Sequence, residues 1–65
     1  MQKLDAAKRE AILNAAKQRL RQYGIQKTTM QEIAKDVGIA VGTLYLYFKN
    51  KDDILIASAE SYAQK

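Results

Sequence analysis

The chain has no cysteine and no histidine among its 65 residues, so packing alone must hold its fold together. A domain of this length buries only about 60% of its unfolded surface, and neither a disulfide nor a common zinc site can reinforce it. The same absences remove imidazole proton relays and the usual nucleophile–base pairs. The composition therefore favours one small domain and argues against an enzyme, a metal site or a bound cofactor.

Basic residues exceed acidic ones, giving a net charge of +4, and the excess lies in the first part of the chain. Residues 1–27 hold seven basic and two acidic side chains, whereas residues 28–65 carry a slight negative excess. A basic small domain suggests nucleic acid or an anionic membrane as partner, although a basic surface can serve solubility alone. No apolar run is long enough to span a membrane or resembles a signal peptide, so we expect a cytoplasmic protein.

The first predicted helix covers residues 5–23. Asp5 is a plausible N-cap, and Gly24 is expected to end the helix in the left-handed conformation. Apolar residues recur at three- and four-residue steps, as expected for one face of an amphipathic helix. This stripe comprises Ile12, Ala15, Ala16, Leu20 and Tyr23.

A second helix is predicted over residues 30–36, because Thr29 and Glu32 have the spacing of a capping box. Its stop signal is Gly38. Only Ile39 and Ala40 then lie between this glycine and a third helix predicted over residues 41–47. The apolar face of the second helix comprises Ile33, Ala34 and Val37.

In the third helix, a rotation of 100° per residue places Leu44 and Phe48 in the core, with Ala40 and Val41 nearby. Tyr47 falls on the boundary. The outward face comprises Gly42, Thr43, Tyr45 and Leu46.

A fourth helix is predicted over residues 51–63, with Asn50 as its N-cap and acidic residues in its first turn. No C-cap precedes Lys65, so this helix looks cut. Its apolar stripe comprises Ile54, Leu55, Ala59 and Tyr62.

These elements predict an all-α fold: a three-helix, homeodomain-like helix-turn-helix bundle followed by the start of a fourth, connecting helix. Exposed apolar groups in a cluster usually mark a contact surface, which gives the outward face of residues 41–47 a functional meaning. An alternative is a small helical protein-interaction module that uses the exposed Tyr45–Leu46 patch. A membrane-surface helix would explain the basic first helix but leaves the capping box and the Gly38 turn without a role.

A set of short motifs extends from the second predicted helix to the start of the fourth: Thr28-Thr29, Ile33-Ala34, Gly38-Ile39, Gly42-Thr43-Leu44-Tyr45, Tyr47-Phe48 and Lys51. Through these motifs the chain resembles the N-terminal domain of the TetR family of bacterial transcriptional repressors over about residues 8–60.

The resemblance implies that the third helix enters the major groove of DNA. Lys51 would grip a phosphate at the start of the fourth helix, and Leu46 would contact an apolar feature such as a thymine methyl. The DNA-binding residues implied are Thr29, Gln31, Ala40, Val41, Gly42, Thr43, Tyr45, Leu46, Tyr47 and Lys51.

Each of these assignments has a structural alternative. Thr29 could act only as a helix cap, and Gly42 could simply relax packing against the preceding turn. Tyr45 and Tyr47 could be half-buried core aromatics, and Lys51 could be a solvated lysine. The alternatives stay open at the level of sequence.

Other basic residues have less defined roles. An N-terminal arm could reach a flanking phosphate or the minor groove, whereas the cationic residues further along the first helix are expected to be solvated surface. The arm comprises Lys3, Lys8 and Arg9, and the solvated set comprises Lys17, Arg19 and Arg21.

Two positions depart from the family pattern. Ala40 stands where a serine often opens the third helix, and the missing N-cap makes that helix a candidate for local mobility. Leu46 replaces a polar or larger aromatic group, and no charged residue occurs over 40–47. Sequence preference is therefore expected to depend on methyl contacts, Gln31, Thr43 and DNA shape.

The resemblance also implies a longer protein. Family members usually continue into an all-helical domain that binds a small-molecule effector and forms a homodimer, and that domain is absent from this sequence. The expected partners are double-stranded DNA with a palindromic operator, a small-molecule effector and a second copy of the full-length protein, with no membrane. The isolated domain should bind DNA weakly, because the second half-site contact is lost.

Overall fold

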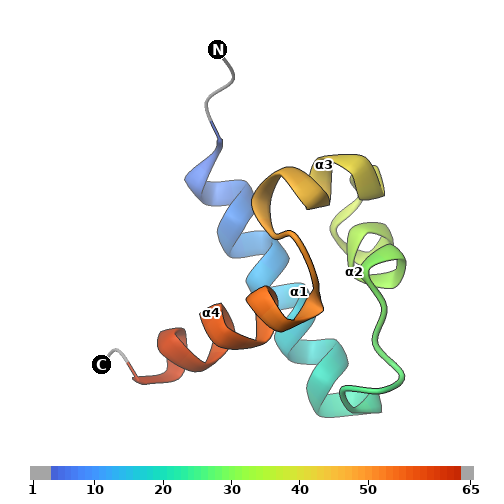
Figure 1. Ribbon diagram of the computed structural model, residues 1–65, viewed down its shortest axis with the longest axis vertical. Coiled ribbons are helices and arrows are strands. Elements are labelled where there is room, and N and C mark those ends of the chain that lie inside the picture. The colour runs from blue at the N-terminus through green and yellow to red at the C-terminus, as the bar shows by residue number, and fades with distance from the viewer. Residues whose placement is uncertain (1–3, 64–65) are drawn as a thin grey trace.

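A computed structural model describes residues 4–63, with side chains described up to residue 60. The described chain forms four helices: α1 (Ala6–Tyr23), α2 (Met30–Val37), α3 (Val41–Tyr47) and α4 (Lys51–Ala63). α1 packs against both α2 and α4, while α3 packs mainly on α2. Figure 1 shows α3 beside the first half of α1, and α4 crossing α1 and extending away from α2 and α3. The all-helical, helix-turn-helix fold class is confirmed.

α1 begins after Asp5, whose carboxylate accepts hydrogen bonds from the backbone N–H groups of Ala7 (2.9 Å) and Lys8 (3.4 Å). At the other end the N–H of Gly24 donates to the Leu20 carbonyl at 3.0 Å. Gly24 has the positive φ of 87° that a glycine tolerates, but its ψ is 169°. The expected left-handed helical conformation at Gly24 is therefore wrong, because the chain leaves the helix in an extended direction.

α2 has the predicted capping box at its start and a glycine turn at its end. The Glu32 N–H donates to the Thr29 hydroxyl at 3.1 Å, and the Thr29 N–H donates to the Glu32 carboxylate at 3.2 Å. Gly38 adopts the left-handed conformation (φ 87°, ψ 31°), and the next N–H, of Ile39, donates to the Ala34 carbonyl at 3.0 Å. This Schellman arrangement satisfies the last carbonyls of α2 and directs the chain into α3 within a few residues. The helix extends one residue beyond the predicted 30–36 range.

The two later helices begin differently. No side-chain hydrogen bond caps α3 at Ala40, as the alanine there predicts. α4 is capped by Asn50, whose side-chain oxygen accepts from the Asp53 N–H at 2.9 Å. Asp52 and Asp53 lie in the first turn of α4, where a carboxylate interacts favourably with the helix dipole.

One apolar core joins all four helices, and Leu44 and Phe48 belong to it as predicted. Two other expectations are wrong: Tyr23 and Ala59 are exposed. The side chain of Tyr62 lies outside the described residues. The core residues are Ile12, Leu13, Ala16, Met30, Ile33, Ala34, Leu44, Phe48, Ile54 and Ala57.

The burial of Leu13 on α1 and the choice of the buried row on α4 both depend on how these two helices pack. α1 is covered by α2 and α4 together, so its buried surface widens around its circumference to include Leu13. α4 buries Ile54, Ala57 and Ser58, a three- and four-residue spacing offset from the predicted stripe. Because Leu55 and Ala59 form an equally apolar row on α4, the pattern alone could not identify which row faces α1.

Candidate nucleic-acid interface

The surface of α3 that faces away from the core is exposed and uncharged. Gly42, Tyr45 and Leu46 are exposed, the last two at 48% and 51%, while Thr43 is half-buried. Leu44, on the opposite side of the same helix, is fully buried. The predicted outward orientation of this face is therefore confirmed, and it offers methyl, aromatic and hydroxyl groups rather than charge.

Gly42 has no packing reason to be a glycine. A β-carbon built at Gly42 would meet no heavy atom within 4 Å, so the residue does not relax a contact with the turn before α3. The alternative that assigned Gly42 to internal packing is wrong. A glycine in a helix costs roughly 0.5–1 kcal/mol relative to alanine, and nothing within the described fold compensates for that cost.

The remaining residues at the start of α3 and α2 have mixed environments. Val41 is half-buried and packs against the core, whereas Ala40 at the N-cap position is exposed. Gln31 is exposed in the first turn of α2. Ala40 and Gln31 are thus available to a partner at the start of each helix, while Val41 is partly committed to the core.

Thr29 has its hydroxyl group engaged within the protein. The hydroxyl accepts the Glu32 N–H and lies 3.2 Å from the Glu32 carboxylate, to which it donates. Donation to a DNA phosphate would require the Thr29 hydroxyl to leave that carboxylate. Its role as a cap is established by the structure, and its contact with DNA stays a prediction.

Tyr47 joins the end of α3 to the start of α1. Its hydroxyl oxygen accepts a hydrogen bond from the Asp5 N–H at 3.0 Å, and its ring is half-buried against the core. The Asp5 carboxylate caps α1 at the same place, so one residue ties both helices together. The hydroxyl proton of Tyr47 is not used in this hydrogen bond and can be donated to an external acceptor.

Lys51 joins the start of α4 to the loop between α1 and α2. Its Nζ donates to the Ile25 carbonyl at 2.7 Å, and the side chain is half-buried. The alternative of an ordinary solvated lysine is therefore wrong. An ammonium group carries three N–H donors, so two remain for a phosphate while the third holds the loop.

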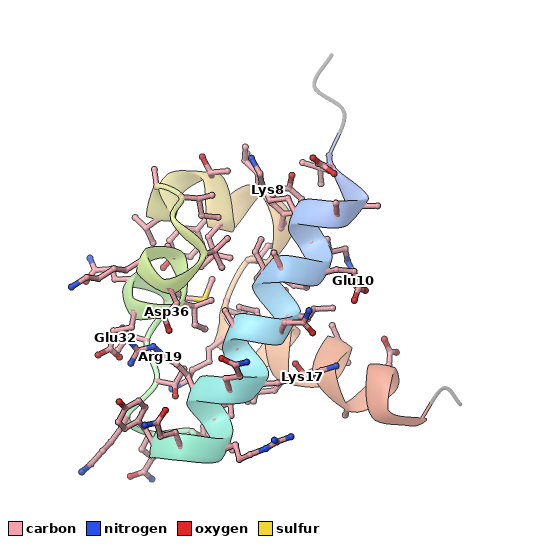
Figure 2. All side chains as sticks on the ribbon, turned by 180° about the vertical axis from the view of Figure 1, so that it is seen from behind. Lys8, Glu10, Lys17, Arg19, Glu32 and Asp36 are labelled. Carbon is pink, nitrogen blue, oxygen red and sulfur yellow. The ribbon has the colours of Figure 1, made fainter. Side chains whose placement is uncertain are left out.

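Arg19 is not simply solvated surface, contrary to the sequence-based expectation. Its guanidinium contacts the Asp36 carboxylate through Nε (2.5 Å) and Nη2 (3.1 Å), and Nη1 lies 3.6 Å from Glu32. Figure 2 shows Arg19 of α1 reaching the two acidic residues on α2. The hydrogen bond from Arg19 lowers the pKa of the Asp36 carboxyl, and the same bond raises the pKa of the Arg19 guanidinium.

The basic arm is described only in part, because Lys3 lies outside the described residues. The Arg9 guanidinium carbon lies 5.3 Å from the centre of the Phe48 ring, a cation–π distance. Lys8 is half-buried and lies at the end of α1 that is beside α3 (Figure 2). The described part of the arm thus places positive charge at the end of α1 that lies beside α3.

Thr28 has a positioning role that sequence reasoning missed. It is fully buried, its hydroxyl donates to the Gly24 carbonyl at 2.8 Å, and its N–H donates to the Ile25 carbonyl at 3.2 Å. These bonds fix the loop that delivers Thr29 to the start of α2. In the sequence, Thr28 stood out only as part of the Thr28-Thr29 motif of the family resemblance, and no separate role was assigned to it.

α2 and α3 are joined by a tight turn at Gly38, and α1 packs against this pair. α3 exposes a face of apolar and hydroxyl groups. This arrangement defines a helix-turn-helix DNA-binding domain. The chain belongs to the tetR family of bacterial regulatory proteins, whose family description matches residues 12–58. No helix within residues 4–63 has the length and apolar character needed to cross a membrane.

Named relatives are transcriptional regulators. The chain is 48% identical over 46 residues to the fatty acid metabolism regulator protein of Bacillus subtilis (strain 168). The matched region covers 71% of this chain and 24% of that protein. It is 39% identical over 61 residues to the HTH-type transcriptional regulator YvdT of the same organism. This match covers 94% of this chain and 31% of that protein.

A solved structure, of the fatty acid degradation regulator FadR from Bacillus halodurans, matches with a TM-score of 0.78 and 41% identity over 86% of this chain and 30% of that chain. The chain therefore spans less than a third of the length of each of these relatives. It is a DNA-binding domain of a tetR-family transcriptional regulator.

Proposed function

We propose that α3 enters the major groove and that its uncharged face selects the operator sequence. The observation that carries this proposal is the exposure of Gly42, Tyr45 and Leu46 on one face of α3, with open space around Gly42. Gly42 would let the helix backbone approach the DNA closely. Leu46 would contact thymine methyl groups, because a leucine side chain can offer no hydrogen bond to a base edge.

Phosphate contacts around α3 would set its position in the groove without selecting sequence. Lys51 has two donors left for a phosphate beyond its bond to Ile25, and Tyr47 has its hydroxyl proton. Gln31 and the cap residue Thr29 would face the DNA at the start of α2. The basic arm of α1 would add a salt-dependent attraction along the flanking backbone.

The longer relatives support a wider proposal for the whole protein. The chain covers less than a third of each relative described above, so the remaining length would hold an effector-binding and dimerisation region. A homodimer would present two copies of α3 to a palindromic operator, and a small-molecule effector would release the repressor from it. Such a regulator acts in the cytoplasm, where the bacterial chromosome lies.

The test compares variants on a set of DNA duplexes. Operators are first selected from a random pool by the wild-type chain, and binding of each variant is then followed by fluorescence anisotropy. Leu46→Gln should change the rank order of the duplexes, since it replaces the methyl contact with hydrogen-bonding groups. Lys51→Ala should weaken all duplexes by a similar factor and reduce the salt dependence, because it removes a phosphate contact.

A matched control uses another exposed aliphatic residue outside the interface. Ile56 on α4 is 59% exposed, so Ile56→Gln makes the same kind of change as Leu46→Gln without touching α3. Equal weakening of every duplex by Leu46→Gln would contradict base readout by Leu46. Binding of protein partners with no affinity for any duplex would instead favour the protein-interaction module that uses Tyr45 and Leu46.

A further inference from the structure

The two acidic residues of α2, Glu32 and Asp36, are held by the same arginine of α1. Nη1 of Arg19 lies 3.6 Å from Glu32 Oε2, and Nη2 donates to Asp36 Oδ1 at 3.1 Å. Figure 2 shows the Arg19 side chain extending from α1 toward both carboxylates. The side chain of Arg19 is 19% exposed and that of Glu32 is 43% exposed. Arg19 is therefore largely covered by its neighbours, whereas Glu32 stays open to a partner.

The Glu32 carboxylate lies at the start of α2, which is proposed to face the DNA. Its Oε1 accepts hydrogen bonds from the Thr29 N–H and from the Thr29 hydroxyl, both at 3.2 Å. In the free domain this negative charge interacts favourably with the N-terminal end of the helix dipole. When DNA approaches, the same charge repels a phosphate that comes within reach of Thr29. Binding at this point therefore requires that the charge of Glu32 be neutralised from another side.

We propose that Arg19 is a positioning residue for DNA binding, which neutralises the Glu32 carboxylate and holds it toward α1 so that a phosphate can approach Thr29. This inference rests on the proposed function, because it takes the start of α2 to face DNA. When the Thr29 hydroxyl turns from Glu32 to a phosphate, Arg19 keeps the carboxylate paired. An acidic capping box can then stabilise α2 in the free domain without opposing the bound DNA.

Asp36 has a different part in this arrangement. Its carboxylate accepts from both Nε and Nη2 of Arg19, and such a bidentate pair fixes the plane of the guanidinium. Nη1 is thereby left for Glu32. Asp36 lies four residues after Glu32, which places it about 6 Å farther along the axis of α2 from the proposed phosphate. The two carboxylates therefore share one arginine but differ in their distance from the DNA.

The experiment is a double-mutant cycle between Arg19 and Glu32, with binding to a wild-type-selected operator followed by anisotropy at low salt, where charge effects are least screened. Arg19→Met should weaken binding about three- to tenfold, as expected for an unpaired carboxylate at about 6 Å from a phosphate near a wet surface. Glu32→Gln removes the charge and keeps a residue that can complete the capping box. In the Glu32→Gln background, Arg19→Met should therefore cause a much smaller loss.

One matched control measures what the loss of any basic residue does to binding. Arg21 is exposed on the same helix, so Arg21→Met removes the same charge without disturbing Glu32. The loss from Arg21→Met should be the same with and without Glu32→Gln. The loss from Arg19→Met should fall to that level once Glu32→Gln is present.

A second control separates charge from bracing of α1 against α2. Asp36→Asn makes a carboxylate-to-amide change within the same cluster and breaks the bidentate pair. Arg19 can still pair with Glu32 in this variant, so operator binding should stay near that of the wild type. Added to Arg19→Met, Asp36→Asn should leave most of the loss in place, whereas Glu32→Gln should remove it.

Lost stability is separated from lost charge by a further variant. Arg19→Gln keeps N–H donors for Asp36 but carries no charge, so it should weaken binding as Arg19→Met does. Circular dichroism establishes that each variant is folded at the temperature of the binding measurement. Wild-type affinity of the Arg19→Gln variant would overturn the proposal.

Three other results would also contradict the role of Arg19. An equal loss from Arg19→Met with and without Glu32→Gln would indicate a direct phosphate contact or a bracing role. Asp36→Asn that binds as weakly as Arg19→Met would indicate bracing, and rescue by Asp36→Asn as complete as that by Glu32→Gln would indicate net charge alone. Failure of the proposed function is distinct from these results, because the wild-type chain would then select no operator and both proposals would fall.

Discussion

Replacing Gly42 with alanine should stabilise the domain and weaken its binding to DNA. The two effects have opposite signs because the added methyl group acts in two places. It favours the helical conformation within the protein, and it would occupy space needed for DNA at the proposed interface. Within the protein, the new methyl group meets no heavy atom within 4 Å and Gly42 has no positive φ. Only the intrinsic preference of the helix for alanine then acts on the fold.

The magnitudes follow from these two environments. Glycine to alanine in a helix contributes roughly 0.5–1 kcal/mol, which raises the melting temperature of a domain this small by about 2–8 °C. At a closely packed interface an extra methyl group costs about 1–3 kcal/mol. That cost corresponds to operator binding about 5- to 150-fold weaker.

The matched control is Gly38→Ala, which makes the same chemical change in the turn between α2 and α3. A β-carbon at Gly38 also meets open space, but φ is 87°, so the left-handed conformation costs about 1–2 kcal/mol. Thermal unfolding by circular dichroism and operator binding by anisotropy should therefore separate the two variants. Gly42→Ala that binds the operator as tightly as the wild type would refute the close approach of the α3 backbone to DNA.

Three further outcomes are expected. Ala40→Ser should supply the missing N-cap of α3, raise the unfolding free energy by about 1 kcal/mol and slow amide exchange in α3. If exchange in α3 of the wild type is already as slow as in α1, the expected mobility of α3 is contradicted. Tyr47→Phe removes the acceptor for the Asp5 N–H and should lower the unfolding free energy by about 0.5–1.5 kcal/mol in urea titrations, whereas no change would show that water replaces the bond. Arg19 lowers the pKa of the Asp36 carboxyl in the folded state. The Arg19–Asp36 pair therefore contributes its full stabilisation above the unfolded-state pKa of about 3.9. That contribution is lost as the pH falls through the lower pKa of the folded state. The difference in stability between wild type and Arg19→Met should therefore shrink as urea titrations move from pH 7 to pH 3, and a difference that is constant with pH would contradict the role of Asp36.

The start of α2 and the turn that ends it were predictable because they depend on local chemistry. The capping box of Thr29 and Glu32 and the left-handed turn at Gly38 use residues within a few positions of one another, so their spacing appears in the sequence. The outward face of α3 was predictable for a related reason. Its seven residues contain one large buried side chain, Leu44, and the helical rotation then determines the positions of the others.

The residues that were mispredicted depend on contacts between distant segments. Arg19 and Asp36 are 17 positions apart, and nothing local distinguishes an arginine that reaches a second helix from one that is solvated. Ala59 and Tyr23 continue apolar rows that are as regular as the buried ones. Which row is buried depends on the angle at which α1 meets α4, and no local pattern encodes that angle.

The structure divides the predicted interface into residues that hold the fold and residues that do not. Thr29 caps α2, Tyr47 ties the end of α3 to the start of α1, and Lys51 ties the start of α4 to the loop between α1 and α2. Gly42 and Leu46, in contrast, are exposed on α3 and do not belong to the core. Substitutions at the first three residues would alter the geometry of the domain together with their proposed phosphate contacts, so we expect their effect on binding to be similar for every DNA sequence.

Gly42 and Leu46 have the opposite property. Their side of α3 makes no contribution to the core, so these positions can change with little cost to the unfolding free energy. Operator preference could then diverge between related domains while the capping, turn and loop contacts stay the same. A third helix without charged residues suits this division, because the proposed methyl contacts and close backbone approach would depend on where α3 lies. The hydrogen bond between Tyr47 and the Asp5 N–H ties the end of α3 to α1.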